Sequence, residues 1–241
     1  MMSILHRIIR PGDNRMNTGI STIQWSASFS AQVVSDSKPH NDIIRVALAI
    51  IECINLCAKE ACCKALYGTL KFMNDAFASV GWTARSYDLF SGKALWDRPI
   101  EMQGKEFPNP FLFASRVSYY AADLGAVANF SSTMGWLDLG QLAENVGRIP
   151  LFGSALKYGV ENIPIVRSTF GLLGNFFDTV DCVRVIIVKG AGRAELFRLA
   201  GTTTKIAANI LFGFQALWLR FLSQVLNGIS ASISLVNLAT K

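Results

Sequence analysis

Charged side chains are scarce in this sequence of 241 residues. They make up 17% of the chain, whereas an ordinary soluble domain has about 25%. Apolar residues make up 51%, and the mean hydropathy is +0.33. This shortage of charge favours a membrane-linked protein over a soluble one, although a large buried helical core can have a similar composition.

Histidine is nearly absent, and the sequence motifs of common enzyme classes are missing. His6 and His40 are the only histidines, and both lie in segments that we predict to be flexible. The chain has no Walker A loop, no GxGxxG after a strand, no HExxH and no GxSxG. We therefore expect a protein that is not an enzyme and that uses no cofactor.

The cysteines are few, odd in number and crowded, which argues against a disulfide scaffold and favours a reducing compartment. They stand at positions 53, 57, 62, 63 and 182. The paired CxxC spacing of zinc sites is missing, so we expect no metal site and interpret these cysteines as small core residues. Acylation of Cys62 or Cys63 is an alternative hypothesis.

The net charge of +6 comes from basic residues that are spread out among apolar ones. Nucleic-acid binding needs a basic patch or stripe, so we expect no nucleic-acid partner. Attraction to anionic lipid headgroups fits this charge better.

Residues 1–40 show no sustained hydrophobic period, and we predict a flexible leader there. The early apolar run is broken by His6, Arg7 and Arg10 and ends at Pro11, so it does not resemble a secretory signal. The arginines with many serines and threonines faintly suggest a transit peptide, but a basic leader is the simpler interpretation.

The segment 41–95 is predicted to be an N-terminal helical region. A first helix should begin after Pro39, capped by Asn41 or Asp42, and run to Ala58. A second, amphipathic helix should cover 60–80 and end near Gly81, with a short helix over 83–95. We predict that its apolar side faces lipid or a partner. This face comprises Leu66, Leu70, Met73 and Phe77.

The segment 96–110 is predicted to be a linker, because three prolines and Gly104 disfavour a helix there. No strand is predicted in the chain. Asn109-Pro110 should open the next helix, and 111–241 forms a C-terminal helical region with a hydrophobic tail at 206–240.

Within this region, Pro164 should stand in the first turn of a helix that runs to about Val188 and ends at Gly190. Gly171 and Gly174 should let a neighbouring helix approach closely. The same helix carries a charged group that we interpret as a structural ion-pair network. Its members are Asp178, Asp181 and Arg184.

The tail itself is long, apolar and almost free of charge. From Ile206 to Thr240 the only ionisable side chain is Arg220. A basic collar precedes the tail, and we predict that it contacts lipid headgroups on the cytoplasmic side of a membrane. The collar residues singled out are Arg193, Arg198 and Lys205.

Two arrangements of the tail are open. A turn at Asn227-Gly228 would give a hairpin of 194–226 and 229–240, whereas a continuous helix would let 221–240 span a membrane alone. Pairs of small residues spaced by four, such as Gly228 with Ser232, are typical of packed membrane helices and could support a homo-oligomer. The predicted fold class is therefore all-α, a multi-helix bundle with a hydrophobic C-terminal helix pair, associated with a membrane.

Two stretches resemble the PEX11 family of peroxisomal membrane-elongating proteins. Residues 111–130 read FLFASRVSYYAADLGAVANF, similar to that family's apolar segment with a Ser-Arg-aromatic pattern. Residues 195–239 resemble the family's closing pattern of a helix, a break and an apolar helix rich in small residues. The resemblance implies a peroxisomal protein whose amphipathic helices bind and elongate a membrane.

The architecture is also similar to that of secreted inclusion-membrane proteins of chlamydia-like bacteria. Those proteins carry two hydrophobic lobes separated by a short turn, and the lobes here are 206–219 and 221–240, with Arg220 between them. This resemblance implies an effector that sits in a host inclusion membrane and recruits host partners.

The leading hypothesis is a helical protein without catalytic activity that binds membrane lipids and shapes or organises a membrane. Wedging of the 60–80 helix into one leaflet would supply the mechanism. The alternatives are the secreted effector and a soluble helical-bundle interaction protein whose tail is its central helix pair.

Overall fold

The computed structural model describes residues 37–58, 63–212 and 216–239, and the fold of these residues is helical apart from one small hairpin. This confirms the all-α fold class. The long helices are α2 (Ser37–Ala58), α3 (Lys64–Phe90), α5 (Pro110–Thr133), α8 (Ile163–Lys189), α9 (Arg193–Phe212) and α10 (Leu217–Ala239). The short ones are α4 (Lys93–Trp96), α6 (Leu139–Gly147) and α7 (Gly153–Glu161).

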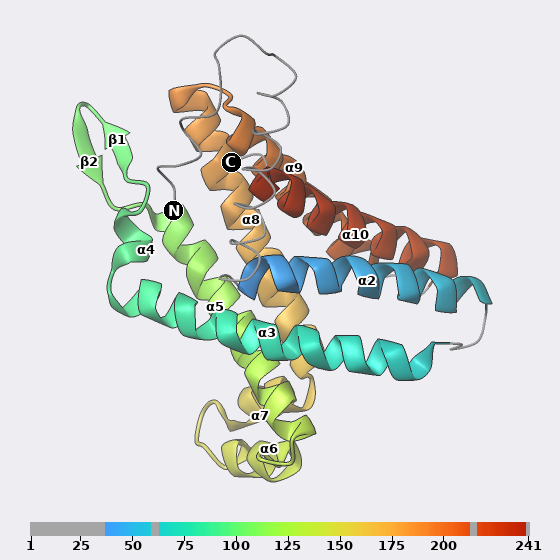
Figure 1. Ribbon diagram of the computed structural model, residues 1–241. Coiled ribbons are helices and arrows are strands. Elements are labelled where there is room, and N and C mark those ends of the chain that lie inside the picture. Colours follow the sequence, from blue (N-terminus) through green and yellow to red (C-terminus); the bar gives the residue numbers. More distant parts are fainter. Residues whose placement is uncertain (1–36, 59–62, 213–215, 240–241) are drawn as a thin grey trace, which may run out of the picture.

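The six long helices form a closed ring in which each packs against two neighbours (Figure 1). The order of packing is α2, α3, α5, α8, α9, α10 and back to α2. The short helices α6 and α7 pack on each other at one end of the α5–α8 pair, and α4 lies between α3 and α5 near the other end. The first and last described helices, α2 and α10, therefore lie side by side.

Residues 1–36 of the predicted flexible leader lie outside the described residues, whereas the prediction is wrong for residues 37–40, because α2 begins at Ser37. The prediction of a cap at Asn41 or Asp42 is wrong, because Asp42 lies inside the helix and its Oδ1 is 3.4 Å from Nη1 of Arg45. Pro39 falls in the first turn, where a helix does not need its missing N–H, so the proline does not delay the start.

Helix α3 passes through Gly81 and ends at Phe90, so the predicted end at Gly81 and the separate helix over 83–95 are both wrong. Gly81 has a packing role instead. A Cβ atom at this position would lie 3.3 Å from Nη2 of Arg85 and 3.7 Å from Oδ2 of Asp123. The glycine therefore leaves room for an ion pair between α3 and α5.

The segment between Trp96 and Pro110 contains a two-stranded hairpin, which contradicts the prediction that the chain has no strand. Strand β1 (Ile100–Met102) pairs antiparallel with β2 (Lys105–Phe107). Gln103 and Gly104 form the turn with φ angles of 52° and 74°, as two-residue hairpin turns require. Strands of this length are too short to give a period in the sequence.

Local start and stop signals in the second half of the chain are confirmed. Asn109 caps α5, since its Oδ1 accepts hydrogen bonds from the backbone N–H groups of Phe111 and Leu112, both at 3.2 Å. Pro164 lies in the first turn of α8, and Gly190 ends that helix with a φ of 89°.

The predicted C-terminal helix pair is present as α9 and α10, which pack against each other, and of the two only α10 is apolar enough to be a candidate membrane span. Asn227-Gly228 lies inside α10, so the predicted hairpin turn at that dipeptide is wrong. Serine hydroxyls join the pair. Ser223 Oγ donates to the carbonyl of Ala208 at 2.7 Å, and Ser230 Oγ donates to that of Gly201 at 2.9 Å.

The two glycines of α8 that were predicted to allow close approach differ in their surroundings. A Cβ atom at Gly174 would lie 2.8 Å from the ring of Tyr119 on α5, whereas one at Gly171 meets nothing within 4 Å.

We expect Gly174→Ala to lower the free energy of unfolding by about 1–3 kcal/mol, because the ring must shift. The matched control Gly171→Ala should raise it by about 0.5–1 kcal/mol. Thermal unfolding of both purified variants checks this, and equal effects would contradict the packing role of Gly174.

Candidate functional site: a polar core inside an apolar shell

The side chains of this fold are distributed in an unusual way between inside and outside. The largest fully buried side chains among the described residues are Asn109, Asp181, Cys182, Ser115, Ser223 and Ser230, and none is a large aliphatic or aromatic group. Large apolar side chains are instead exposed on all six long helices, for example Ile50 on α2 (56%) and Ile187 on α8 (78%). Many of the buried residues are thus small or polar, and many large apolar residues face outward, although a few aliphatic side chains are also buried, namely Ile44, Ile51, Leu112, Ile163 and Val185.

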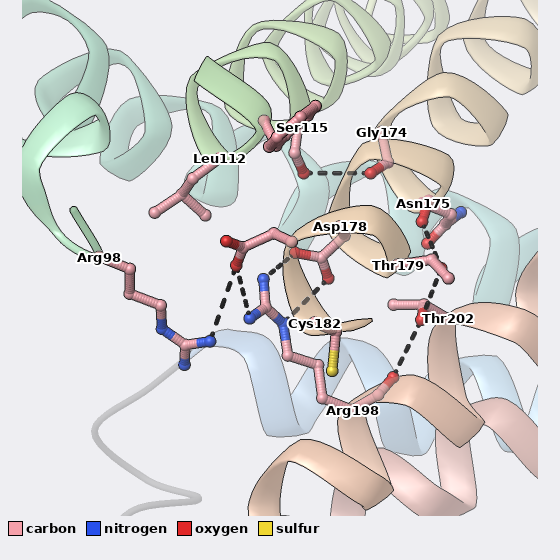
Figure 2. A network of polar contacts seen from close by, with 12 residues as sticks. Arg98, Leu112, Ser115, Gly174, Asn175, Asp178, Thr179, Cys182, Arg198 and Thr202 are labelled. Carbon is pink, nitrogen blue, oxygen red and sulfur yellow. Dashed lines mark hydrogen bonds and ion pairs between the residues drawn. The ribbon is translucent and has the colours of Figure 1, made fainter. Parts of the chain in front are cut away.

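A cluster of charges forms the centre of this polar core, between α8 and α9 (Figure 2). Asp178 and Asp181 stand three residues apart and so share one face of α8. Arg198 enters from α9, with Nη1 at 3.1 Å from Oδ2 of Asp181 and Nη2 paired with Oδ1 of Asp178. Arg184 adds a 2.8 Å contact from its Nη2 to Oδ1 of Asp181, and Arg98 reaches within 3.8 Å of Oδ2.

Asn109 connects this cluster to the start of α5. Besides capping the helix with its Oδ1, its Nδ2 donates to Oδ1 of Asp181 at 2.7 Å and to the carbonyl of Arg98 at 2.8 Å. The side chain is fully buried. One amide therefore holds the first turn of α5, the middle of α8 and the segment before β1 in a fixed relation.

The surroundings set the charge states of the cluster. Burial by itself would raise the pKa of Asp181, but hydrogen bonds from Arg184 and Asn109 and the charge of Arg198 outweigh it and hold that pKa below its ordinary value. Burial works against the charged form of Arg198, yet Asp178 and Asp181 raise the pKa of its guanidinium above the usual range. Asp181 and Arg198 therefore stabilise each other in their charged forms, whereas Nε of Arg184 and Nη1 of Arg98 are buried without a hydrogen-bond partner.

A second polar group lies between α3, α5 and α8. Oδ1 of Asp75 accepts from Nη2 of Arg167 at 2.9 Å, and its Oδ2 accepts from Nδ2 of Asn129 at 2.9 Å. Close by, Arg85 of α3 forms an ion pair with Asp123 of α5. Burial raises the pKa of Asp123 in spite of this partner, so removal from water dominates at that carboxyl group.

Hydrogen bonds along α8 lead from the second group towards the first. The hydroxyl of Tyr119 donates to Oδ1 of Asn175 at 2.7 Å, and Oγ1 of Thr179 lies 2.8 Å from the carbonyl oxygen of Asn175 and 2.9 Å from Oγ1 of Thr202. Ser115 donates to the carbonyl of Gly174 at 3.1 Å. The inward face of α8 is therefore a polar seam that contacts α3, α5 and α9 in turn.

The arrangement is suited to holding helices together. Each carboxylate of the seam faces an arginine, as in a structural ion pair, which agrees with our interpretation of Asp178, Asp181 and Arg184. In the described residues no three His, Cys, Asp or Glu side chains gather in a way that could hold a metal ion. Cys62 of the proposed acylation site lies outside the described residues, and Cys63 is half-buried.

The apolar face that was predicted on the second helix is partly exposed on α3. Leu66 is 52% exposed and Met73 is 39% exposed, and Leu70 and Phe77 beside them are half-buried. The face therefore has accessible apolar side chains along its length, and its contact with lipid or a partner stays a prediction.

The three collar residues occupy different surroundings. Arg193 is exposed, with its guanidinium carbon 5.5 Å from the centre of the Phe197 ring. Lys205 is half-buried. Arg198 has a side chain only 19% exposed and is bound by two aspartates, so the structure gives it a role between helices that the sequence analysis missed. Headgroup contact of the collar stays a prediction.

Two further members of the cluster were missed. Asn109 was predicted as part of a helix start, but nothing in the sequence indicates that its amide nitrogen meets Asp181. Arg98 lies in the predicted linker. The available signal was that three of the cluster's charges, Asp178, Asp181 and Arg184, share a face of one helix and need partners from elsewhere.

Comparison with known proteins gives no relative: no protein-family model, no curated protein and no solved structure matches the chain. The resemblances to the PEX11 family and to inclusion-membrane proteins therefore stay predictions.

The buried charge cluster should contribute much more to the free energy of unfolding than an exposed ion pair does. Asp181→Asn removes a fully buried charge from among three arginines, and we expect it to lower the free energy of unfolding by about 3–5 kcal/mol. The control Glu161→Gln breaks the pair with Lys157, whose side chains are 47% and 50% exposed, and should cost about 0–1 kcal/mol. Denaturant unfolding of the two variants measures both values. A loss below 1 kcal/mol for Asp181→Asn would show that the cluster does not hold the helices together.

Proposed function

We propose that this chain is a membrane-associated helical protein without catalytic activity that organises or shapes a lipid bilayer. The observation that carries the proposal is the distribution of side chains, in which many polar groups are buried and many large apolar groups are exposed. In water, large apolar groups are driven into the interior, each contributing about 1.5–3 kcal/mol when fully buried. Here many of them lie on the outer surface.

The interior supports the same proposal. Helices in lipid have no hydrophobic reason to associate, and they pack through small residues and interhelical hydrogen bonds. Ala208 and Ala231 are fully buried in α9 and α10, and Ser223 and Ser230 bond across that pair. Ionisable side chains in such proteins face the interior and pair with one another, as the Asp178–Arg198–Asp181 cluster does.

Helix α10 is the part best suited to enter the bilayer. It is the one helix among the described residues that is long and apolar enough to cross a membrane, judged by length and composition. Only 17% of its most apolar window is buried, whereas the central helix of a soluble bundle would be covered on most sides. This low burial favours membrane association over the soluble-bundle alternative.

Shaping of the membrane is assigned to α3. Leu66, Met73 and Val80 follow one another at intervals of seven and are all exposed, so they lie along one side of the helix. A helix with such a side can lie in the plane of the bilayer, with its apolar face inserted about 5–10 Å into one leaflet. Insertion into one leaflet expands that leaflet and favours curvature.

Membrane association is tested by carbonate extraction of cells that express the full-length chain. We expect the protein to stay in the membrane pellet, and its release into the supernatant would overturn the proposal. Leu222→Asp places a charge on the exposed side of α10 at a cost of up to about 2.5–3.5 kcal/mol in the bilayer, so part of this variant should be released. Leu151→Asp is the matched control, because Leu151 is 94% exposed in the turn between α6 and α7 and should not affect extraction.

Shaping is tested separately by adding the purified full-length chain to vesicles of phosphatidylserine and phosphatidylcholine and examining them by electron microscopy. We expect tubules with the natural chain and far fewer with the double variant Leu66→Asp, Met73→Asp. The control Gly68→Asp adds a charge on the other side of α3, at an exposed position where a Cβ atom meets nothing within 4 Å, and should keep the activity. Binding without tubules by the natural chain would leave membrane association in place and refute shaping.

A further inference from the structure

An apolar groove lies between α2 and α10. Its volume is about 610 Å³, and its lining combines large apolar side chains with a few small ones. At its floor, a Cβ atom on Gly228 would lie 3.3 Å from Cβ of Ala49, so the two helices touch there. Ile50, Ile54 and Ile229 line it and are between 45% and 56% exposed.

The lining has no full charge and little free polarity. Its hydroxyl group belongs to Ser232, which donates to the carbonyl of Gly228 at 2.9 Å and is thereby satisfied within α10. Burial and the neighbouring Cys57 and Glu52 raise the pKa of the Cys53 thiol, so this side chain is neutral at physiological pH. Gln224 supplies the remaining polar side chain. Such a groove is suited to a hydrocarbon chain.

A cation stands at one end of the groove. Phe197 of α9 lines the groove, and the guanidinium carbon of Arg193 lies 5.5 Å from the centre of its ring. Arg193 is exposed, and no ion pair of its side chain is found within the described ranges. The groove therefore pairs an apolar channel with a positive charge, which is complementary to a lipid with an anionic head and an acyl tail.

The chemistry of the lining favours an acyl chain over a helix of another protein. A helix that docks in a groove is amphipathic and brings polar groups at the edges of its apolar face, whereas the lining has no charged side chain and Gln224 as its one amide. From Phe221 to Val236, the lining of α10 rises about 22 Å. One leaflet of the hydrocarbon core is about 15 Å thick, so the groove can take an acyl tail along its full length.

We propose that the groove between α2 and α10 binds one acyl chain of an anionic phospholipid, with Arg193 contacting the phosphate of its headgroup. This inference rests on the proposed membrane association, because α10 brings the groove into contact with lipid. The bound lipid would cover the apolar sides of both helices and would join the first and last described helices of the ring.

The experiment uses the full-length chain in vesicles that contain phosphatidylglycerol with a photoactivatable group on its acyl chain. After illumination, cross-linked peptides are mapped by mass spectrometry. We expect cross-links concentrated on groove residues of α2 and α10. Ser232→Phe fills the groove and should lower the yield there about tenfold, equivalent to about 1.4 kcal/mol. Thr203→Phe, on the exposed side of α9, is the matched control and should leave the yield unchanged.

The headgroup contact is tested by comparing phosphatidylglycerol with phosphatidylcholine that carries the same group. Arg193→Gln should reduce the preference for the anionic lipid about fivefold, since one cation near a headgroup contributes about 1 kcal/mol. Lys157→Gln, an exposed cation on α7, should not change it. Because Arg193 is exposed, this variant tests the site even if Ser232→Phe fails to fold.

The possible outcomes distinguish a failure of the lipid-binding groove from a failure of the proposed membrane association. Cross-links spread evenly over the exposed apolar residues of the other helices, or unaffected by Ser232→Phe, would refute the groove while membrane association stands. If the chain does not float with vesicles, the groove is tested by native mass spectrometry of the purified chain mixed with phosphatidylglycerol. A retained lipid that Ser232→Phe removes supports the groove without a membrane, and the absence of bound lipid overturns it.

Discussion

A carboxylate that is wholly removed from water stays charged only when cations and donors surround it, and the buried group of Asp181 imposes this condition on the fold. Its partners come from α8, from α9, from the segment before β1 and from the start of α5. Because Asn109 also caps α5, the first turn of that helix is fixed against the middle of α8. In the ring, α3 packs on the other side of α5 and α9 packs on the other side of α8.

The polar core and the apolar surface follow from the same constraint. Once α8 turns its charged and hydroxyl groups inward, its large side chains such as Phe176 and Ile187 are left on the outside. A surrounding of low dielectric constant strengthens the interior ion pairs and makes an unpaired charge very costly. An apolar environment would therefore stabilise both the buried ion pairs and the exposed apolar side chains. In water, by contrast, the exposure of these large apolar side chains would be unfavourable.

The sequence predicts features that depend on a few adjacent residues and misses those that depend on distant ones. Asn109-Pro110, Pro164 and Gly190 mark helix ends through local backbone chemistry, and all three were predicted. Gly81 was misassigned because its role depends on Arg85 and Asp123, which meet only when α3 packs on α5.

The charged residues illustrate the same limit. Asp178, Asp181 and Arg184 lie on one helix, so their network follows from spacing. Arg198 has the same sequence surroundings as the exposed Arg193, a cation before an apolar tail, and nothing local reveals that only Arg198 meets two aspartates of another helix.

The closure of the ring by α2 against α10 imposes an order on synthesis. At about 5–20 residues per second, α2 leaves the ribosome on the order of ten seconds or more before its partner exists. For that time the side of α2 that packs against α10 stays without its partner helix.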